Sequence, residues 1–429
     1  MIILETLDKI AIDYSWSFSD KTIKDTSYIT HGYYTYPAKF IPQLAGRLIE
    51  QHSKQGDIVI DPFMGSGTTV VEALVNDRIG IGTDVNEIAY LVSKVKTTPI
   101  ESKNLYRAFF KIENDLHLRL EKEYEQWVAE AHSQMPKNER IDYWFLPEQR
   151  DKLAIILFTI KEIGDKDIQD FFLVAFSQIL KSTSIWLQKS IKPTRDLKKK
   201  SCDPLKLFLQ QSQKMIKKHI EFDKLLSNSI KENIDIYRKI NCGDSRMIPC
   251  ADETAQLVVT SPPYVTSYEY ADLHQLPSLW LGFLEELAPF RKKFIGSSYK
   301  EREEVDLQSS LANSIVRQLK NKKEREVRNY FADMLETFTE VKRVLKKGGK
   351  ACFVIGNTEF KGVKILNAEV FKEQFESLGF QPHSIIKREI PSKMLPSTRD
   401  VATGRFGKAT KGDIKLAYPT EYILIMEKI

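Results

Sequence analysis

Two short motifs contain the residues of this chain that could do chemistry. The first, called here the glycine-rich motif, is Asp-Pro-Phe-Met-Gly-Ser-Gly-Thr-Thr at residues 61–69. The second, called here the SPPY motif, is Ser-Pro-Pro-Tyr at residues 261–264. Each motif follows a short apolar run that is typical of a buried strand. Loops after such strands line the ligand crevice of an α/β sheet, so both motifs are expected beside one site.

The glycine-rich motif predicts a cradle for a nucleotide-like ligand, because glycines let the backbone approach a ligand closely. The next apolar run, residues 79–83, ends at Asp84, about 20 residues after the glycines, where a carboxylate can bind both hydroxyls of a ribose. The Gly-x-Gly spacing alone also fits a plain strand-to-helix turn. Asp84 could also cap the helix expected from residue 85 onward, and the two roles are compatible.

The SPPY motif contains no group that is typical of a general base or of a covalent nucleophile such as Cys or Lys. Its parts suit a reaction at the exocyclic amine of a nucleobase, whose lone pair is delocalised into the ring. Hydrogen bonds from the amine to the Ser261 side chain and to the rigid Pro262 carbonyl would aim that lone pair at a methyl donor. Tyr264 would stack on the base. The alternative is a simple Pro-Pro turn after the strand.

The two motifs resemble those of the amino-methyltransferases that modify bacterial and archaeal DNA with S-adenosyl-L-methionine. The resemblance covers roughly half of the chain. It implies an α/β class I methyltransferase (Rossmann-like) fold with a mostly parallel seven-stranded sheet. It implies that the catalytic residues are Ser261, Pro262, Pro263 and Tyr264. It also implies that five segments bind the cofactor, through Tyr36, Pro37, Lys39, Phe40, Asp61, Phe63, Gly65, Ser66, Gly67, Thr68, Asp84, Asn86, Asp244 and Ser261.

The first residue of the SPPY motif bears on the choice of substrate. In the family that the chain resembles, Ser at this position is typical of cytosine-N4 enzymes, and Asp or Asn of adenine-N6 enzymes. We therefore expect methylation of cytosine N4 in double-stranded DNA by base flipping, within a restriction-modification system that could include a cognate endonuclease. Adenine-N6 methylation is the alternative, and an RNA guanine-N2 enzyme or a catalytically silent DNA-binding subunit fits less well. Cys250 precedes its strand, which argues against ring-carbon methylation through a Cys nucleophile.

The composition is that of a cytoplasmic enzyme. The chain has 429 residues, of which 42% are hydrophobic, so it can bury a sizeable core. It contains no apolar run of about 18 residues, and its first residues lack a basic start followed by a long apolar stretch, so neither a membrane span nor a secretion signal is expected. The four cysteines are scattered without metal-ligand spacing, and no metal site is predicted.

The order of strand and helix signals predicts a domain with a long insertion. Residues 1–100 would form the first part of the methyltransferase domain, residues 101–237 a mostly helical insert, and residues 238–429 the remaining part. This motif order is that of the family's alpha group, which implies that the insert reads the DNA target. A charged tract at about 291–328 could instead form an arm over DNA or a surface loop. The loop at 387–399 could contact the flipped base or serve as a plain connection.

Positive charge is concentrated in the insert. Residues 181–218 contain 11 Lys or Arg and two Asp, a net charge of +9, whereas the whole chain carries +6. A cluster of this kind can neutralise DNA phosphates, although charged runs are also common on plain solvated surface. The predicted DNA-binding residues are Lys189, Lys192, Arg195, Lys198, Lys199 and Lys200.

Overall fold

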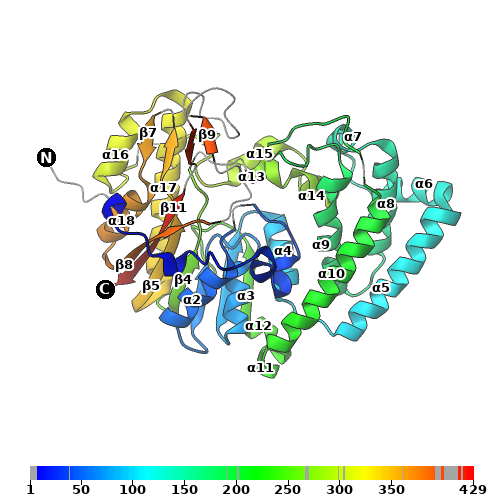
Figure 1. Cartoon of the computed structure of the whole chain (residues 1–429), viewed down its shortest axis with the longest axis horizontal. Helices are drawn as coiled ribbons and strands as arrows, with labels where there is room; N and C mark the ends of the chain where they lie inside the picture. Colours follow the sequence, from blue (N-terminus) through cyan, green and yellow to red (C-terminus); the bar gives the residue numbers. More distant parts are fainter. Residues whose placement is uncertain are drawn as a thin grey trace.

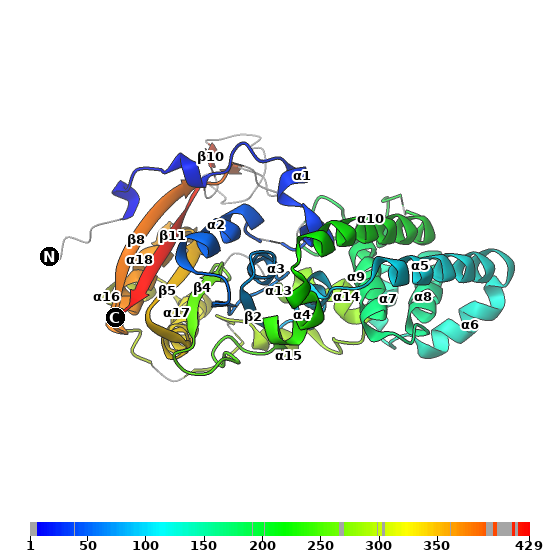
Figure 2. The same cartoon turned by 90° about the horizontal axis from the view of Figure 1, so that it is seen from below.

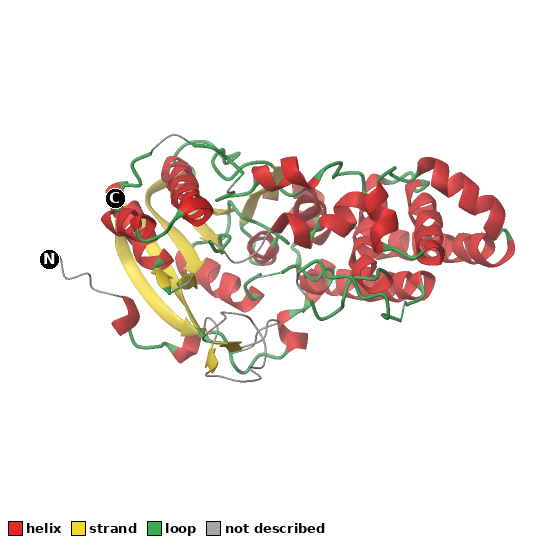
Figure 3. Ribbon diagram, turned by 90° about the horizontal axis from the view of Figure 1, so that it is seen from above, coloured by secondary structure: helices red, strands yellow, loops and turns green. Residues whose placement is uncertain are grey.

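The fold consists of two lobes, one built on a β-sheet and one built of helices (Figure 1). It is a computed structural model that describes residues 7–37, 39–190, 192–200, 202–265, 270–297, 299–302, 305–360, 362–391, 398–400, 414–416 and 419–429. The strands gather in the first lobe, and the second lobe consists of helices and their connecting loops (Figure 3).

Seven strands form the central sheet, in the order β3-β2-β1-β4-β5-β11-β8. The strands are β1 (Ile58–Asp61), β2 (Ile79–Asp84), β3 (Arg238–Cys242), β4 (Ala255–Thr260), β5 (Leu345–Ile355), β8 (Phe380–Glu389) and β11 (Thr420–Lys428). Strands β1 to β5 pair in parallel, and β11 pairs antiparallel with both β5 and β8. This sheet confirms the predicted class I methyltransferase fold.

Helices cover both faces of the sheet. Successive side chains of a strand point to opposite faces, and the central strands carry apolar side chains on both. On one face, Val59 and Val259 pack with residues of α2 (Pro42–His52). On the other face, Ile60 and Val258 pack with residues of α17 (Asn321–Val344) and α18 (Asn367–Ser377). Helix α3 (Thr68–Val75) follows β1, and α4 (Glu87–Thr97) follows β2. The two strand-to-helix turns that bear the predicted cofactor residues therefore lie at one edge of the sheet.

The described part of the insert between α4 and β3 consists of helices and their connecting loops, with one β-bridge between Trp186 and Arg195. Its helices are α5 (Ser102–His117), η4 (Leu118–Lys122), α6 (Tyr124–Gln134), α7 (Glu139–Trp144), α8 (Pro147–Lys161), α9 (Lys166–Thr183), α10 (Pro204–Leu225), α11 (Asn228–Glu232) and α12 (Ile234–Tyr237). Aspartates cap the two longest of these helices: Asp165 accepts from the amides of Asp167 and Ile168, and Asp203 accepts from the amide of Lys206.

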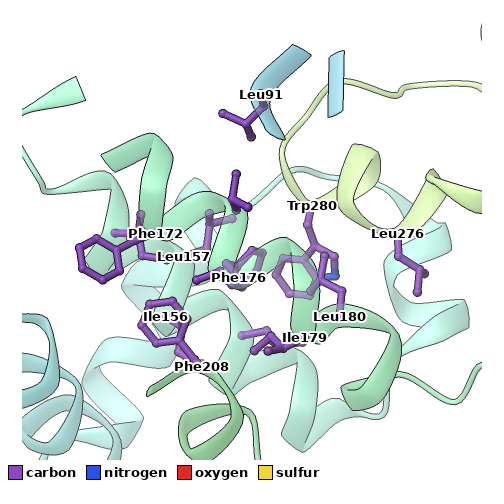
Figure 4. Close-up of a cluster of buried hydrophobic side chains, with 14 of the residues drawn as sticks. Leu91, Ile156, Leu157, Phe172, Phe176, Ile179, Leu180, Phe208, Leu276 and Trp280 are labelled. Carbon is purple, nitrogen blue, oxygen red and sulfur yellow. The ribbon is translucent and has the colours of Figure 1, made fainter. Parts of the chain in front are cut away.

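The helical lobe also uses residues that follow the SPPY motif. Helices α13 (Tyr270–Leu273), α14 (Gln275–Trp280) and α15 (Leu287–Lys293) contribute to the same hydrophobic cluster as the insert and α4. Trp280 of α14 lies against Phe176 of α9, with ring centroids 5.7 Å apart (Figure 4). The core of the helical lobe thus extends beyond the boundary expected at residue 237.

The N-terminal segment runs along the edge strand β8 (Figure 2). Ile12 forms a β-bridge with Lys387, and the amide of Asp13 donates to the Lys387 carbonyl at 2.8 Å. The remaining elements are η1 (Leu7–Lys9), η2 (Tyr14–Trp16), α1 (Ile23–Thr26), η3 (Ile29–Gly32), α16 (Ser310–Arg317) and the two small sheets of β6 (Thr358–Phe360) with β7 (Val363–Ile365) and of β9 (Thr398–Asp400) with β10 (Ile414–Leu416).

Candidate active site

A pocket opens at the carboxyl ends of β1, β2, β3 and β4. Its lining consists of Tyr36, Pro37, Lys39, Phe40, Pro62, Phe63, Met64, Gly65, Ser66, Thr68, Asp84, Val85, Gly243, Asp244, Ser245, Ser261, Pro263, Lys293, Phe294 and Ile295. The first residue of the SPPY motif, Ser261, therefore lies in the same pocket as the glycine-rich motif. Parallel pairing of β1 with β4 explains this, since it places the two following loops side by side.

Most of the predicted cofactor residues line this pocket. The exceptions are Asp61, Gly67 and Asn86. Of the predicted catalytic residues, Ser261 and Pro263 line the pocket. The pocket also contains residues that the sequence did not single out, among them Lys293, Phe294 and Ile295 from the charged tract. The signal that could have indicated them is the apolar pair that follows the basic run at the end of α15.

Two glycines set the shape of the glycine-rich loop. Gly65 and Gly67 have φ values of +48° and +74°, a region that other residues rarely adopt. A Cβ atom on Gly67 would lie 2.8 Å from the Ser93 hydroxyl oxygen, and one on Gly65 would lie 3.0 Å from the Tyr36 ring. The loop therefore requires glycine at both positions, and its backbone forms the pocket wall directly.

Asp84 both shapes and lines the pocket. Its two carboxylate oxygens accept hydrogen bonds from the amides of Gly65 at 2.9 Å and Asn86 at 3.0 Å. Burial raises the pKa of Asp84 to about 6. The cap of α4 is Asn86, whose side-chain oxygen accepts from the Ile88 amide at 3.0 Å. Asp84 is thus not the capping residue of α4, and it lines the pocket in which a ribose is expected.

Asp61 lies beneath the pocket rather than in its lining. The side chain is 1% exposed and accepts from the Thr260 hydroxyl at 2.6 Å and from the Phe63 amide at 3.1 Å. Burial raises the pKa of Asp61 to about 6. In this geometry Asp61 joins the two loops, and its direct contact with a cofactor stays a prediction.

The charged tract at 291–328 closes one end of the pocket. Both carboxylate oxygens of Asp244 accept from Arg246, at 2.9 and 2.6 Å, and Arg246 also donates to buried Asp333 of α17 at 2.9 Å. Asp333 accepts from the Gly296 amide at 2.9 Å and from Arg302 at 2.8 Å. The described part of the tract therefore folds onto α17, not outward as an arm over DNA.

Two lysines lie near the glycine-rich loop: Lys96 is buried, and Lys39 is half-buried in the pocket lining. The Nζ atom of Lys96 donates to the Ser66 carbonyl, and that of Lys39 donates to the His31 carbonyl at 2.9 Å. Burial lowers the pKa of Lys39 to about 8 and the pKa of Lys96 well below its usual value. A carboxylate bound near Lys39 would oppose this lowering, because an opposite charge favours the ammonium form.

Part of the predicted DNA-binding cluster is exposed and part is not. The segment around the bridge between Trp186 and Arg195 exposes Lys189, Lys192, Arg195, Lys198 and Lys200. Lys199 differs, since its Nζ donates to the carbonyls of Lys181 at 2.7 Å and Trp186 at 2.8 Å. This geometry does not favour phosphate binding by Lys199, because its ammonium group holds the segment together, and that role stays a prediction.

Comparison with known proteins identifies the class of enzyme. The family model for N6/N4 DNA methylases, described as DNA methylase, matches residues 5–94 and 255–429, and the chain belongs to this family. The intervening residues, unmatched by that model, contain the helical insert. The protein is therefore a DNA methyltransferase of the N4/N6 type, and its methyl donor is S-adenosylmethionine.

Curated relatives resemble the chain over most of its length. The Type II methyltransferase M.MvaI of Kocuria varians is 29% identical over 415 residues, which cover 89% of this chain and 88% of the relative. M.MjaII of Methanocaldococcus jannaschii is 23% identical, with coverage of 90% of this chain and 81% of the relative. M.BsoBI of Geobacillus stearothermophilus is 24% identical, covering 83% and 79% respectively.

The described residues contain neither a membrane-spanning helix nor a metal cluster. None of their helices is both long and apolar enough to cross a membrane. They contain no group of three or more His, Cys, Asp or Glu side chains arranged to hold a metal ion. Of the loop expected at 387–399, residues 387–389 end β8, and residues 392–397 lie outside the described part of the chain.

Proposed function

We propose that this enzyme methylates the N4 amine of cytosine in double-stranded DNA. The observation that carries the proposal is that Ser261, the first residue of the SPPY motif, lines the same pocket as Gly65 and Asp84. A motif that begins with Ser is typical of cytosine-N4 enzymes in the family that the sequence resembles, whereas adenine-N6 enzymes typically have Asp or Asn there.

The pocket residues fit S-adenosylmethionine. The Ser66 hydroxyl is buried and has no hydrogen-bond partner among the described residues, so it can bind a ligand group without giving up a contact. Asp84 would accept from the ribose hydroxyls, Asp244 would contact the adenine, and the backbone of the glycine-rich loop would hold the methionine end, near Lys39. When bound, the cofactor supplies an electrophilic methyl group on a sulfonium.

Residues of the SPPY motif would prepare the amine for transfer. The Ser261 hydroxyl oxygen and the Pro262 carbonyl would accept hydrogen bonds from the two N–H groups of the amine, which withdraws the lone pair from conjugation and fixes its direction. Tyr264 would hold the base plane by stacking. The surplus proton leaves after transfer, for which water is a sufficient acceptor.

The target base must leave the duplex to reach this pocket, since an amine within a base pair has its protons engaged and its faces covered. The exposed cluster of Lys189, Lys192, Arg195, Lys198 and Lys200 would contact phosphates, and the helical lobe would read the sequence. The relatives are named Type II methyltransferases, which supports a role in a restriction-modification system with a cognate endonuclease.

Mass spectrometry of nucleosides tests the proposal directly. DNA without prior methylation is incubated with the purified enzyme and S-adenosylmethionine, digested to nucleosides and compared with N4-methylcytosine and N6-methyladenine standards. We expect N4-methylcytosine. N6-methyladenine as the product would overturn the choice of base while leaving the cofactor pocket as described.

A further inference from the structure

The ring of Tyr264 is fixed at its hydroxyl group by a residue far away in the sequence. The hydroxyl donates to Oε2 of Glu421 on β11 at 3.0 Å. The other carboxylate oxygen of Glu421 accepts from Nη1 of Arg388 on β8 at 2.6 Å. Each carboxylate oxygen of Glu421 therefore has its own partner, the Tyr264 hydroxyl for one and Arg388 for the other.

The pair of Arg388 and Glu421 is buried within the sheet. The two residues face each other in the antiparallel register of β8 and β11, and they are 3% and 7% exposed. Nη2 of Arg388 also donates to the Ser17 carbonyl at 3.3 Å. A buried carboxylate is costly unless both of its oxygens are bonded, so removal of either partner is unfavourable.

The contact crosses a strand of the sheet, and a glycine permits it. Tyr264 follows β4, and β5 separates β4 from β11. Gly356 comes directly after β5, and a Cβ atom there would lie 3.1 Å from the Tyr264 ring. The absence of a side chain at Gly356 thus lets the ring pass over the end of β5 to reach Glu421.

We propose that Glu421, held by Arg388, is a positioning residue for methyl transfer, because it fixes the ring of Tyr264 before the target base arrives. This inference rests on the proposed function, in which Tyr264 stacks on the base. A ring held at its hydroxyl and along its edge presents one plane to the base, and methyl transfer needs the amine in line with the methyl donor. Small misplacement of reacting groups is enough to cost about 100-fold in rate.

A double-mutant cycle tests the proposal. Tyr264→Phe removes the hydroxyl and keeps the ring. Arg388→Met combined with Glu421→Leu removes the acceptor without leaving a buried unpaired charge, a replacement that proteins often tolerate. Single-turnover methyl transfer and cofactor affinity are measured for wild type, for Tyr264→Phe, for the paired variant (Arg388→Met with Glu421→Leu) and for the combination of all three changes.

We expect Tyr264→Phe and the paired variant each to slow methyl transfer about tenfold. The combination should slow transfer no more than either alone, and cofactor affinity should stay within about twofold of wild type.

The same strand supplies a matched control. Lys350 and Glu427 face each other on β5 and β11 with a separation of 3.8 Å, and Lys350→Met with Glu427→Leu makes the equivalent replacement away from Tyr264. This variant is expected to transfer at the wild-type rate. Glu421→Gln keeps one acceptor oxygen for Arg388 and an amide beside the Tyr264 hydroxyl, so it should retain more activity than the paired variant.

The outcomes separate this inference from the proposed function. Wild-type transfer in the paired variant, or rate reductions that multiply in the combination, would overturn the role of Glu421. Unchanged transfer in Tyr264→Ala would instead overturn the assignment of Tyr264 on which it rests. The rate is measured as total methyl transfer, so the cycle gives the same answer whether the product is N4-methylcytosine or N6-methyladenine.

Discussion

The hydroxyl of Thr260 donates a hydrogen bond of 2.6 Å to Oδ1 of Asp61, inside the protein and directly beneath the pocket. Asp61 is the last residue of β1, and Thr260 is the last residue of β4. One hydrogen bond thus joins the strand that leads into the cofactor loop to the strand that leads into the SPPY motif. We expect the spacing between cofactor and target amine to depend on this junction.

The pH dependence of stability reports on Asp61. Burial raises its pKa from 3.8 to about 6, so the folded chain binds more protons than the unfolded chain in that window. Asp61 therefore lowers the free energy of unfolding as pH rises from 3.8 to about 6. Asp61→Asn removes this titration, and its amide oxygen can still accept from Thr260.

We expect the stability of Asp61→Asn relative to wild type to increase across this window, by up to about 1.36 kcal/mol per pH unit, and to be constant above it. Urea unfolding of both proteins at a series of pH values measures the difference. Parallel stability curves would mean that the Asp61 carboxyl titrates at its ordinary pKa.

Ser261→Ala should slow methyl transfer by about 100-fold, because it removes an oxygen that accepts a hydrogen bond from the amine as charge develops. Cofactor affinity should stay nearly unchanged, since the side chain is proposed to act on the base. Single-turnover rates and calorimetry together measure the two quantities. A normal rate in this variant would remove Ser261 from the catalytic assignment.

Asp84→Ala should weaken binding of S-adenosylmethionine by about 1.5–3 kcal/mol, the typical value for a hydrogen bond to a charged group. The change also removes the acceptor for the amides of Gly65 and Asn86, so it loosens the loop as well. Asp235→Ala, at a side chain that is 94% exposed, is the control. Equal affinities in calorimetry for the two variants would contradict a role of Asp84 in binding the cofactor.

Gly67→Ala should lower both the stability of the fold and the affinity for the cofactor, since φ is +74° and the new Cβ would lie 2.8 Å from the Ser93 hydroxyl oxygen. Gly56→Ala separates the two causes, because Gly56 has φ of +81° but no atom within 4 Å of the added Cβ. Gly56→Ala should cost about 1–2 kcal/mol of stability from backbone strain alone and leave cofactor binding normal. Thermal unfolding with and without S-adenosylmethionine measures both effects. Similar destabilisation in the two variants would show that the clash with Ser93 does not matter.

The exposed basic segment should bind DNA through charge. Replacing Lys198 and Lys200 by Ala should weaken DNA binding and lower the slope of log affinity against log salt by about 0.9 for each phosphate that is no longer neutralised. Lys199→Ala is the informative comparison, because its ammonium group is bonded to the carbonyls of Lys181 and Trp186. We expect Lys199→Ala to reduce stability and leave the salt slope unchanged. A slope like that of wild type in the double variant would place the DNA surface elsewhere.

Local sequence was sufficient to predict the fold class and most of the pocket lining. The apolar runs before Asp61 and Thr260 predict two buried strands. The glycines of the loop that follows Asp61 reflect backbone angles that other residues rarely adopt. Such features depend on a few neighbouring residues and can therefore be read along the chain. The family match confirms the enzyme class that these residues indicated.

Contacts between distant segments could be decided only by the tertiary structure. Nothing near Lys199 in the sequence distinguishes it from Lys198 and Lys200, yet folding directs its ammonium group to two carbonyls. Glu421 meets Tyr264 across 157 residues of chain because the sheet places β11 two strands away from β4. Local sequence thus determined which groups could do chemistry, whereas strand order and burial decided which groups meet, since those depend on how the whole chain packs.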